Sequence, residues 1–268
     1  MQVTAADIRH WYSSPDAPGK VDDYTAAHAD RLAQAFTALP GLAPGFAALL
    51  IGSWGREAPL LASVFGCRRA VCVRAPEPGV PRVEELTLRG PDAAPVRCQA
   101  HALDVEREHL PDGLTGFDLA LLWEVVEHMQ ADPAMAVWQG VRGLRVGGLI
   151  SITTPNALWY QHTLNHLRGV NSVSLRLRRT YPFSTHWREY APAELADLVE
   201  RMGCRPLFVG SFLDPDAASI KGRAARRAIE LCRKGSGNGN PSGLRHAMVI
   251  AEKVRESELA RPAWLYPD

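Results

Sequence analysis

The fold is decided by Phe117-Asp-Leu-Ala-Leu-Leu-Trp-Glu-Val-Val-Glu-His-Met129, an apolar run that ends in a carboxylate and leads into a helix. A second apolar run follows at Gly147-Gly-Leu-Ile-Ser-Ile-Thr-Thr-Pro-Asn156, and the residues between the two, 132–144, have a helical pattern. Strands that are apolar throughout are typical of parallel sheets covered on both faces. The two runs therefore predict two buried parallel strands joined by one helix.

Length and composition indicate an ordinary globular protein. The chain has 268 residues, of which 46% are hydrophobic and 22% are charged, enough for one large α/β domain. The net charge of +1 gives no electrostatic reason to expect nucleic acid or an anionic membrane surface as a partner. No apolar run is long enough to span a membrane, and the first residues lack the pattern of a secretory signal. We therefore expect a cytoplasmic protein.

The five cysteines are scattered and show no metal-ligand spacing, so we expect small buried side chains and no metal site. Working outward from the central pair, apolar runs alternate with helical patterns, which predicts βαβ units and a doubly wound, mostly parallel sheet. We expect seven strands, with an antiparallel pair at the end, over residues 47–51, 70–73, 96–101, 117–123, 148–154, 206–210 and 246–251.

The remaining segments surround this sheet. Residues 1–46 are amphipathic and predict a helical N-terminal extension. Residues 47–253 form the sheet domain, interrupted after the fifth strand by a helical insertion over 157–190, and residues 254–268 form a C-terminal tail. Further helices are expected over 191–203, which has Pro192 near its start and Gly203 at its end, and over 217–233.

Ligands of an open parallel sheet bind beyond the carboxyl ends of its strands. Here the strand ends are Gly52-Ser-Trp-Gly55, Arg74, Asp104 and Trp123-Glu124. Backbone N–H groups of a glycine turn that enters a helix can hold an anion. The Asp104 carboxylate can accept from an adenine amino group or a ribose hydroxyl, or it can cap a helix over 105–110, and the sequence leaves both interpretations open.

Taken in order, these segments resemble the motifs of class I S-adenosylmethionine-dependent methyltransferases over residues 45–253. Leu50-Ile-Gly-Ser-Trp-Gly55 resembles the glycine-rich first motif, and His101-Ala-Leu-Asp104 the segment that reads the adenine. Phe117–His128 resembles the fourth motif, and Leu144–Leu149 with Thr154-Pro-Asn156 the fifth. His186-Trp-Arg-Glu-Tyr190 resembles a segment frequent in members that modify sugars or bacterial secondary metabolites. The resemblance implies a Rossmann-like fold.

The resemblance also implies a cofactor and its binding residues. S-adenosylmethionine would be bound by Gly52, Ser53, Trp54, Gly55, Arg74, Asp104, Val105, Trp123 and Glu124. Asp104 and Val105 would contact the adenine, the glycine turn would face the methionine portion, and Trp123 and Glu124 would line the floor beneath the sulfonium. The implied reaction is methylation, on oxygen, of a glycan or secondary-metabolite acceptor. The aromatic residues of the insertion over 157–190 would form a lid on the acceptor side or pack as a small satellite core, and the sequence leaves both interpretations open.

Three positions depart from the family pattern. Leu50 stands where the family has an acid, Trp54 lies beside a shortened glycine turn, and Arg74 replaces the acid that binds the ribose. These departures motivate a second hypothesis, a catalytically inactive methyltransferase-like protein that serves as a binding or regulatory partner. Arg74 would also suit the 2′-phosphate of NADP, although no G-x-G-x-x-G follows the first strand.

The candidate catalytic residues are His128, His186 and Glu127, because a hydroxyl nucleophile benefits from a base and histidine titrates near neutrality. Glu124 and His128 are four residues apart, which predicts that they share one face of a helix. His162 and His166 have the same spacing, but without a third ligand we expect them at the surface or in the acceptor pocket.

No nucleic acid and no membrane is expected as a partner, and a homodimer is left open.

Overall fold

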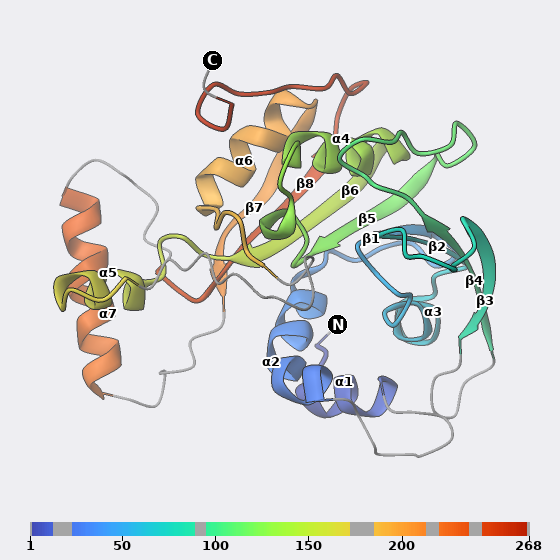
Figure 1. Ribbon diagram of the computed structural model, residues 1–268. Coiled ribbons are helices and arrows are strands. Elements are labelled where there is room, and N and C mark those ends of the chain that lie inside the picture. Colours follow the sequence, from blue (N-terminus) through green and yellow to red (C-terminus); the bar gives the residue numbers. More distant parts are fainter. Residues whose placement is uncertain are drawn as a thin grey trace.

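The computed structural model describes residues 2–12, 23–88, 95–171, 185–212, 220–235 and 243–266. A mixed eight-stranded sheet lies at its centre, in the order β3-β4-β2-β1-β5-β6-β8-β7 (Figure 1). The strands are β1 Ala47–Ile51, β2 Arg69–Arg74, β3 Val83–Leu88, β4 Val96–Ala102, β5 Phe117–Trp123, β6 Leu144–Pro155, β7 Cys204–Phe212 and β8 His246–Lys253. The five central strands β4, β2, β1, β5 and β6 are parallel, and the predicted antiparallel pair at the end is confirmed as β7 and β8.

Helices cover both faces of this sheet (Figure 1). One face is covered by α1 Ala5–Trp11, α2 Asp23–Ala38 and α3 Ala58–Phe65, and the other by α4 Pro133–Gly143 and α6 Pro192–Arg201. The helices α5 Tyr160–Leu167 and α7 Ile220–Gly235 pack beside each other, away from the sheet. Within the described residues, none of the helices has the length and apolar character needed to cross a membrane.

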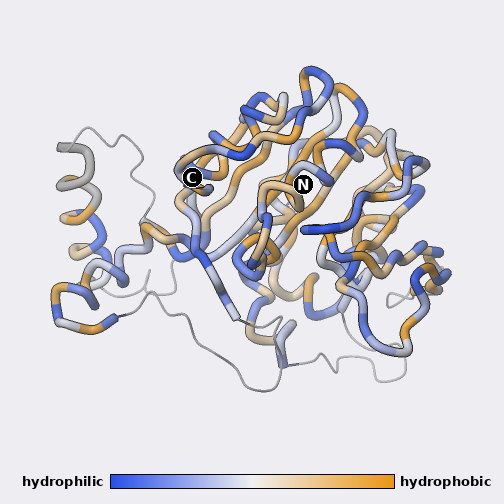
Figure 2. Tube along the Cα trace, turned by 45° about the horizontal axis from the view of Figure 1, so that its top comes forward, coloured by the Kyte–Doolittle hydropathy of each residue, from blue (hydrophilic) through white to orange (hydrophobic). Residues whose placement is uncertain are grey.

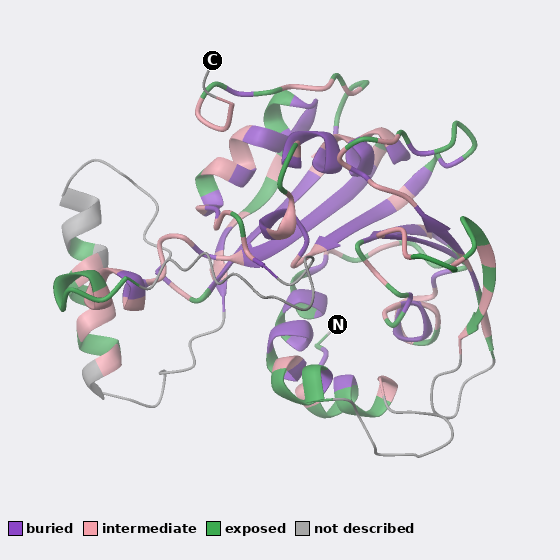
Figure 3. Cartoon of the chain, viewed as in Figure 1, coloured by how far each residue is buried: buried purple, intermediate pink, exposed green. Residues whose placement is uncertain are grey.

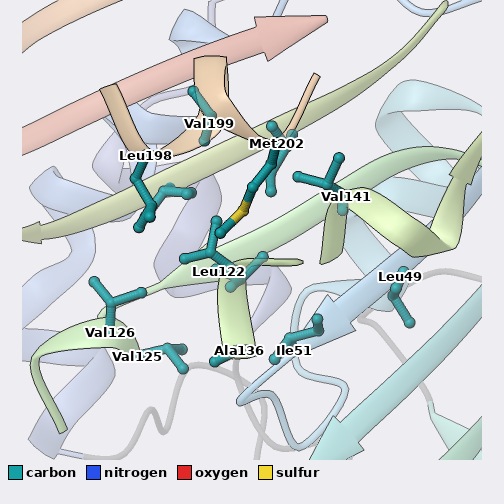
Figure 4. Packing of buried hydrophobic residues seen from close by; sticks show 14 of the residues in the cluster. Leu49, Ile51, Leu122, Val125, Val126, Ala136, Val141, Leu198, Val199 and Met202 are labelled. Carbon is teal, nitrogen blue, oxygen red and sulfur yellow. The ribbon is translucent and has the colours of Figure 1, made fainter. Parts of the chain in front are cut away.

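The central strands feed two cores because successive side chains point to opposite faces. In β1, Leu49 and Ile51 join the cluster that contains Val141 of α4 and Val199 of α6 (Figure 4). The alternate residue Leu50 joins the cluster beneath α1, α2 and α3. The central strands are buried along most of their length (Figure 3), and hydrophobic residues follow the same strands (Figure 2). Burial on both faces explains why these strands are apolar throughout.

The expected number of strands is wrong by one, because β3 was not predicted. This strand, Val83-Glu-Glu-Leu-Thr-Leu88, lies at the edge of the sheet, antiparallel to β4, and its side chains alternate between exposed and half-buried. Such a strand is not a continuous apolar run, since only one of its faces packs on the protein. The alternation of polar and apolar residues was the available signal.

The helix expected directly after β5 is also wrong. The backbone of Glu124 has a φ of 57°, which ends the strand in a sharp turn, and a single 3₁₀ turn follows over Val126–His128. Glu124 and His128 therefore do not lie on one face of an α-helix. The helices expected in the N-terminal segment are present as α1 and α2, and that expected over 217–233 is present as α7. Part of the predicted N-terminal extension, residues 13–22, and part of the predicted insertion, residues 172–184, lie outside the described residues.

Candidate functional site

A cavity of about 490 Å³ opens at the carboxyl ends of the central parallel strands. Its lining residues lie at or after the ends of four strands: Gly52 and Trp54 follow β1, 73–77 end β2 and follow it, 103–107 follow β4, and 124–130 supply several residues after β5. The order of strands reverses here, since the chain passes from β1 to β2 on one side and β5 lies on the other. A cavity of this size at a reversal point is where α/β sheets bind small molecules.

The glycine turn after β1 is held closely against the sheet. The Gly52 N–H donates to the Val73 carbonyl at 2.7 Å, and its φ of 76° is a conformation that side-chain-bearing residues rarely adopt. A Cβ on Gly52 would lie 2.4 Å from a methyl carbon of Val125. The Ser53 hydroxyl accepts from the Gly55 N–H and donates to the Glu57 carboxylate. Gly52 and Trp54 thus line the cavity, whereas Ser53 and Gly55 shape the turn.

Trp54 and Arg74 form one wall of the cavity. The Arg74 guanidinium lies 4.9 Å from the centroid of the half-exposed Trp54 ring, within the range of a cation–π contact. It also lies 3.1 Å from the carboxylate of Glu84, on the strand β3. The charge of Arg74 is therefore balanced by the unpredicted edge strand. These two side chains bound the cavity and do not fill it.

Asp104 and Val105 line the cavity beyond β4. One oxygen of Asp104 accepts from Arg107 at 2.7 Å and the other from the Glu106 N–H at 3.1 Å. Residues 105–107 form turns and not a helix, so the interpretation of Asp104 as the cap of a helix over 105–110 is wrong. Each carboxylate oxygen has two lone pairs, which leaves Asp104 able to accept a further hydrogen bond from a ligand.

The two residues expected at the floor of the site point to different places. The Trp123 indole donates to the Ser151 hydroxyl at 3.0 Å and packs edge-on against Phe36 of α2, and it does not line the cavity. Glu124 does line it, and its carboxylate lies 2.7 Å from Arg31 of α2 and accepts from Thr153 at 3.1 Å. The sharp backbone turn at Glu124 places these consecutive side chains apart.

The three candidate catalytic residues converge beside the cavity. His128 lines it, Glu127 is completely buried behind it, and the His186 ring lies 4.8 Å from the His128 ring, edge to face. Burial lowers the pKa of His128 to about 4, with a further contribution from His186. Burial raises the pKa of Glu127 to about 7, opposed in part by hydrogen bonds that include one from Thr154 at 2.9 Å. His162, by contrast, pairs with Glu189 at 2.9 Å, and His166 is exposed on α5.

Sequence reasoning missed one charged residue at the site, Arg31, and gave no role to another, Glu77. Arg31 reaches it from α2, where it lies among the buried residues Ala29, Leu32 and Ala33. An arginine on the apolar face of a helix was the available signal, because a buried charge requires a partner. Glu77 lines the cavity from the loop after β2, three residues beyond the arginine that stands at the strand end.

Comparisons with known proteins find a likeness in fold to proteins of solved structure. No family model and no curated protein matches the chain. A proposed methyltransferase, solved in complex with the Haloferax volcanii Trm112 methyltransferase activator, is 12% identical, with a TM-score of 0.50 over 84% of this chain and 89% of that one. An S-adenosylmethionine-dependent methyltransferase of Mesorhizobium loti is 17% identical, with a TM-score of 0.48 over 82% and 95%.

A third solved structure contains ligands. It is the 1,6-didemethyltoxoflavin-N1-methyltransferase of Burkholderia thailandensis, with 1,6-didemethyltoxoflavin and S-adenosylhomocysteine bound. It is 17% identical, with a TM-score of 0.47 over 79% of this chain and 72% of that one. At such identities a likeness shows the fold and not the reaction. The chain has a Rossmann-like α/β fold, which it shares with the proposed methyltransferase of the Haloferax volcanii complex.

Proposed function

We propose that the chain is an S-adenosylmethionine-dependent methyltransferase that methylates an oxygen of a small-molecule or glycan acceptor. The observation that carries this proposal is the cavity at the reversal point of the sheet, which remains open beside Trp54 and Arg74. It is bounded by a carboxylate, Asp104, on the β4 side and by an imidazole, His128, on the β5 side. Nucleoside recognition and activation of an acceptor thus have separate residues within one site.

The lining fits the cofactor despite the departures in its first motif. Gly52 allows a ligand to approach the backbone, and Leu103 and Val105 supply apolar contacts for a purine. Asp104 would accept from the adenine amino group. Glu77 would accept from the ribose hydroxyls in place of an acid at the end of β2, where Arg74 is already paired with Glu84. When bound, S-adenosylmethionine supplies a methyl group already activated by its sulfonium.

The remaining task of the protein is to align and activate the acceptor. We assign this task to Glu127, His128 and His186, which lie together at the β5 end of the cavity. His128 is placed to contact an acceptor, since it lines the cavity. Trp187, which follows His186, donates its backbone N–H to the Glu127 carbonyl at 2.6 Å. This bond fixes the segment that carries His186 against the turn that carries the other two.

The test is calorimetric binding of S-adenosylhomocysteine to the purified chain. We expect binding, and we expect Asp104→Ala to weaken it by roughly tenfold or more, since hydrogen bonds to charged groups contribute about 1.5–3 kcal/mol. Arg107→Met is the matched control, because it removes the same ion pair and keeps the carboxylate. No heat at millimolar ligand would reject the proposal. Equal losses in both variants would assign the effect to the ion pair and not to adenine recognition.

The second hypothesis, a protein that keeps the fold without the cofactor, rests on Trp54 and Arg74 at the cavity wall. Thermal unfolding separates the two hypotheses, because a ligand that binds the folded state alone raises the melting temperature. Stabilisation by S-adenosylmethionine supports the enzyme, and its absence supports the inactive protein. NADP serves as a further ligand in the same series. We expect no stabilisation by NADP, because Glu84 neutralises the guanidinium that would hold its phosphate.

A further inference from the structure

Three side chains of the types that ligate metals meet at the edge of the cavity, although they come from two distant segments of the chain. Glu127 and His128 lie in the turn after β5, and His186 lies in the segment that follows α5. One ligating atom from each residue lies within 4.8 Å of the other two. These three residues do not have the short sequence spacing by which a metal site is usually recognised. The cluster is therefore found in the folded structure and not in the sequence.

Within the described residues, one carboxylate oxygen of Glu127 accepts a hydrogen bond and the other does not. Its side chain is fully buried, and one oxygen accepts from the Thr154 hydroxyl at 2.9 Å. The other oxygen, Oε1, has no hydrogen-bond partner within the described part of the chain. A buried charged oxygen without a partner is unfavourable by about 1–3 kcal/mol or more. This atom faces the imidazole of His128, whose Nε2 lies 3.8 Å away.

The distance between Glu127 Oε1 and His128 Nε2 fits two ligands of one metal ion better than a hydrogen bond. At 3.8 Å the contact is too long for a hydrogen bond. Two ligands that each lie about 2.1 Å from a tetrahedral zinc ion are about 3.4 Å apart. Movements of about 1 Å or less would bring all three ligand atoms to metal-binding distance.

Thr185, the residue before His186, orients the ring of His128 so that it can bind a metal ion. Its Nδ1 lies 3.1 Å from the carbonyl oxygen of Thr185, and a carbonyl can only accept, so Nδ1 carries the proton. The lone pair of the neutral ring is therefore on Nε2, the nitrogen that faces Glu127. A metal-bound histidine commonly donates its other N–H to a backbone carbonyl in this way. Because Thr185 precedes His186, one segment both supplies a ligand and orients another.

The nearby charges leave the Glu127 carboxylate available to a cation. Arg31, the closest cation on α2, is paired with Glu124 at 2.7 Å, which also accepts from Thr153. His246 lies beside Glu124, 3.3 Å from it, and burial lowers the pKa of this histidine to about 3, so it is neutral. Glu189 is paired with His162. In the described part of the chain, Glu127 Oε1 thus has no partner within hydrogen-bond distance.

We propose that Glu127, His128 and His186 bind a divalent transition-metal ion of the zinc type, at the edge of the cavity. Two imidazole nitrogens and one carboxylate oxygen are the ligands of catalytic zinc and of related ions, whereas Mg²⁺ and Ca²⁺ prefer oxygen. Three protein ligands leave a coordination position open, and His128 lies at the cavity wall. Its role rests on the proposed function: such an ion would orient an acceptor hydroxyl and lower the pKa of that group.

The test measures metal binding directly. The chain is purified, stripped with a chelator, and titrated with Zn²⁺ by calorimetry and with Co²⁺ by visible absorption. We expect one equivalent to bind, and we expect Mg²⁺ not to compete. Glu127→Gln and His186→Gln should each weaken Zn²⁺ binding by more than about 100-fold, beyond the loss typical of an outer-shell change. Circular dichroism of the metal-free variants verifies their folding, and His128→Gln replaces any variant that does not fold.

The matched control is the double variant His162→Gln/His166→Gln, which removes the other pair of histidines at metal-ligand spacing. Its Zn²⁺ affinity should equal that of the parent chain. Loss of binding in this control, or retention in the Glu127 and His186 variants, would overturn the proposal. S-adenosylhomocysteine binding is measured on the same metal-free samples. If the chain binds S-adenosylhomocysteine but not Zn²⁺, the metal site is refuted and the proposed methyltransferase is not. If it binds Zn²⁺ but not S-adenosylhomocysteine, the proposed methyltransferase is refuted and the metal site is not.

Discussion

At the scale of single residues, Gly52 has two requirements that no other residue type meets. Its φ of 76° disfavours any side chain, and the space where a Cβ would stand is occupied by Val125. Val125 itself is held in the turn after β5 and lines the cavity. The glycine therefore sets how closely the ends of β1 and β5 approach, and with it the floor of the ligand site.

We predict that Gly52→Ala destabilises the fold by about 2–4 kcal/mol, as the sum of a left-handed backbone and an overpacked contact. Gly79→Ala is the matched control, because Gly79 has a similar φ of 79° but no atom within 4 Å of its Cβ position. Urea unfolding should give the control roughly 1–2 kcal/mol, the backbone cost alone. Adding Val125→Ala should restore part of the loss in Gly52→Ala. Equal losses at both glycines would show that Val125 does not restrict this turn.

At the scale of elements, prediction from sequence succeeded where burial leaves a continuous pattern. The strands β1, β2, β5 and β8 are buried on both faces, so each is an apolar run whose position sequence reveals. β3 has one exposed face and carries Glu84 and Glu85, so its apolar residues are too few to stand out. The turn after β5 could not be predicted either, since the positive φ of Glu124 is maintained by contacts from distant elements.

The site shows the same limit. The glycine turn, Asp104 and His128 follow strand ends, and sequence therefore places them in one region. The packing of Trp123 against Phe36, the pairing of Arg74 with Glu84, and the approach of Arg31 each depend on contacts between elements far apart in the chain. No local pattern encodes such contacts. Sequence reasoning thus located the cavity, while the partners of its charged groups required the fold.

The C-terminal segment is attached to the start of α4 through Asp132. This carboxylate caps α4 by accepting from the Met135 N–H at 3.0 Å, and it also accepts from Arg261 at 2.5 Å and from the Tyr266 hydroxyl at 2.5 Å. Burial acts to raise the pKa of Asp132, but the bonds from Arg261 and Tyr266 prevail and lower it below the ordinary value. The charged form is therefore favoured by folding.

The sign of the pH effect follows from this lowered pKa. The stabilisation by Asp132 is complete above the unfolded pKa of about 3.9 and is lost as the pH falls through the lower folded value. We predict that Asp132→Asn, which can still cap the helix, lowers the free energy of unfolding by about 1 kcal/mol at pH 7 and by progressively less below pH ~4. Asp112→Asn, at an exposed ion pair with Arg142, should change little. A pH-independent difference for Asp132→Asn would contradict this account.

At the scale of the whole molecule, the N-terminal helices are part of the architecture of the site. Phe36 of α2 packs against Trp123, and Arg31 of the same helix reaches Glu124 at 2.7 Å with 4% of its side chain exposed. Arg31 also donates to the Tyr24 hydroxyl at 2.6 Å. Since Glu124 lines the cavity and ends β5, this ion pair connects the first helices of the chain to the edge where ligands would bind.

A buried ion pair adds little net stability, but removal of one partner is costly because the other charge stays buried. We predict that Arg31→Met lowers the free energy of unfolding by about 3–5 kcal/mol. The double variant Arg31→Met/Glu124→Gln should lose clearly less than the two single losses combined, because no charge is then left without its partner. Arg205→Met, which removes an exposed partner of Glu252, should cost at most about 1 kcal/mol. Strict additivity of the Arg31 and Glu124 changes in urea unfolding would mean that α2 is not coupled to the site through this pair.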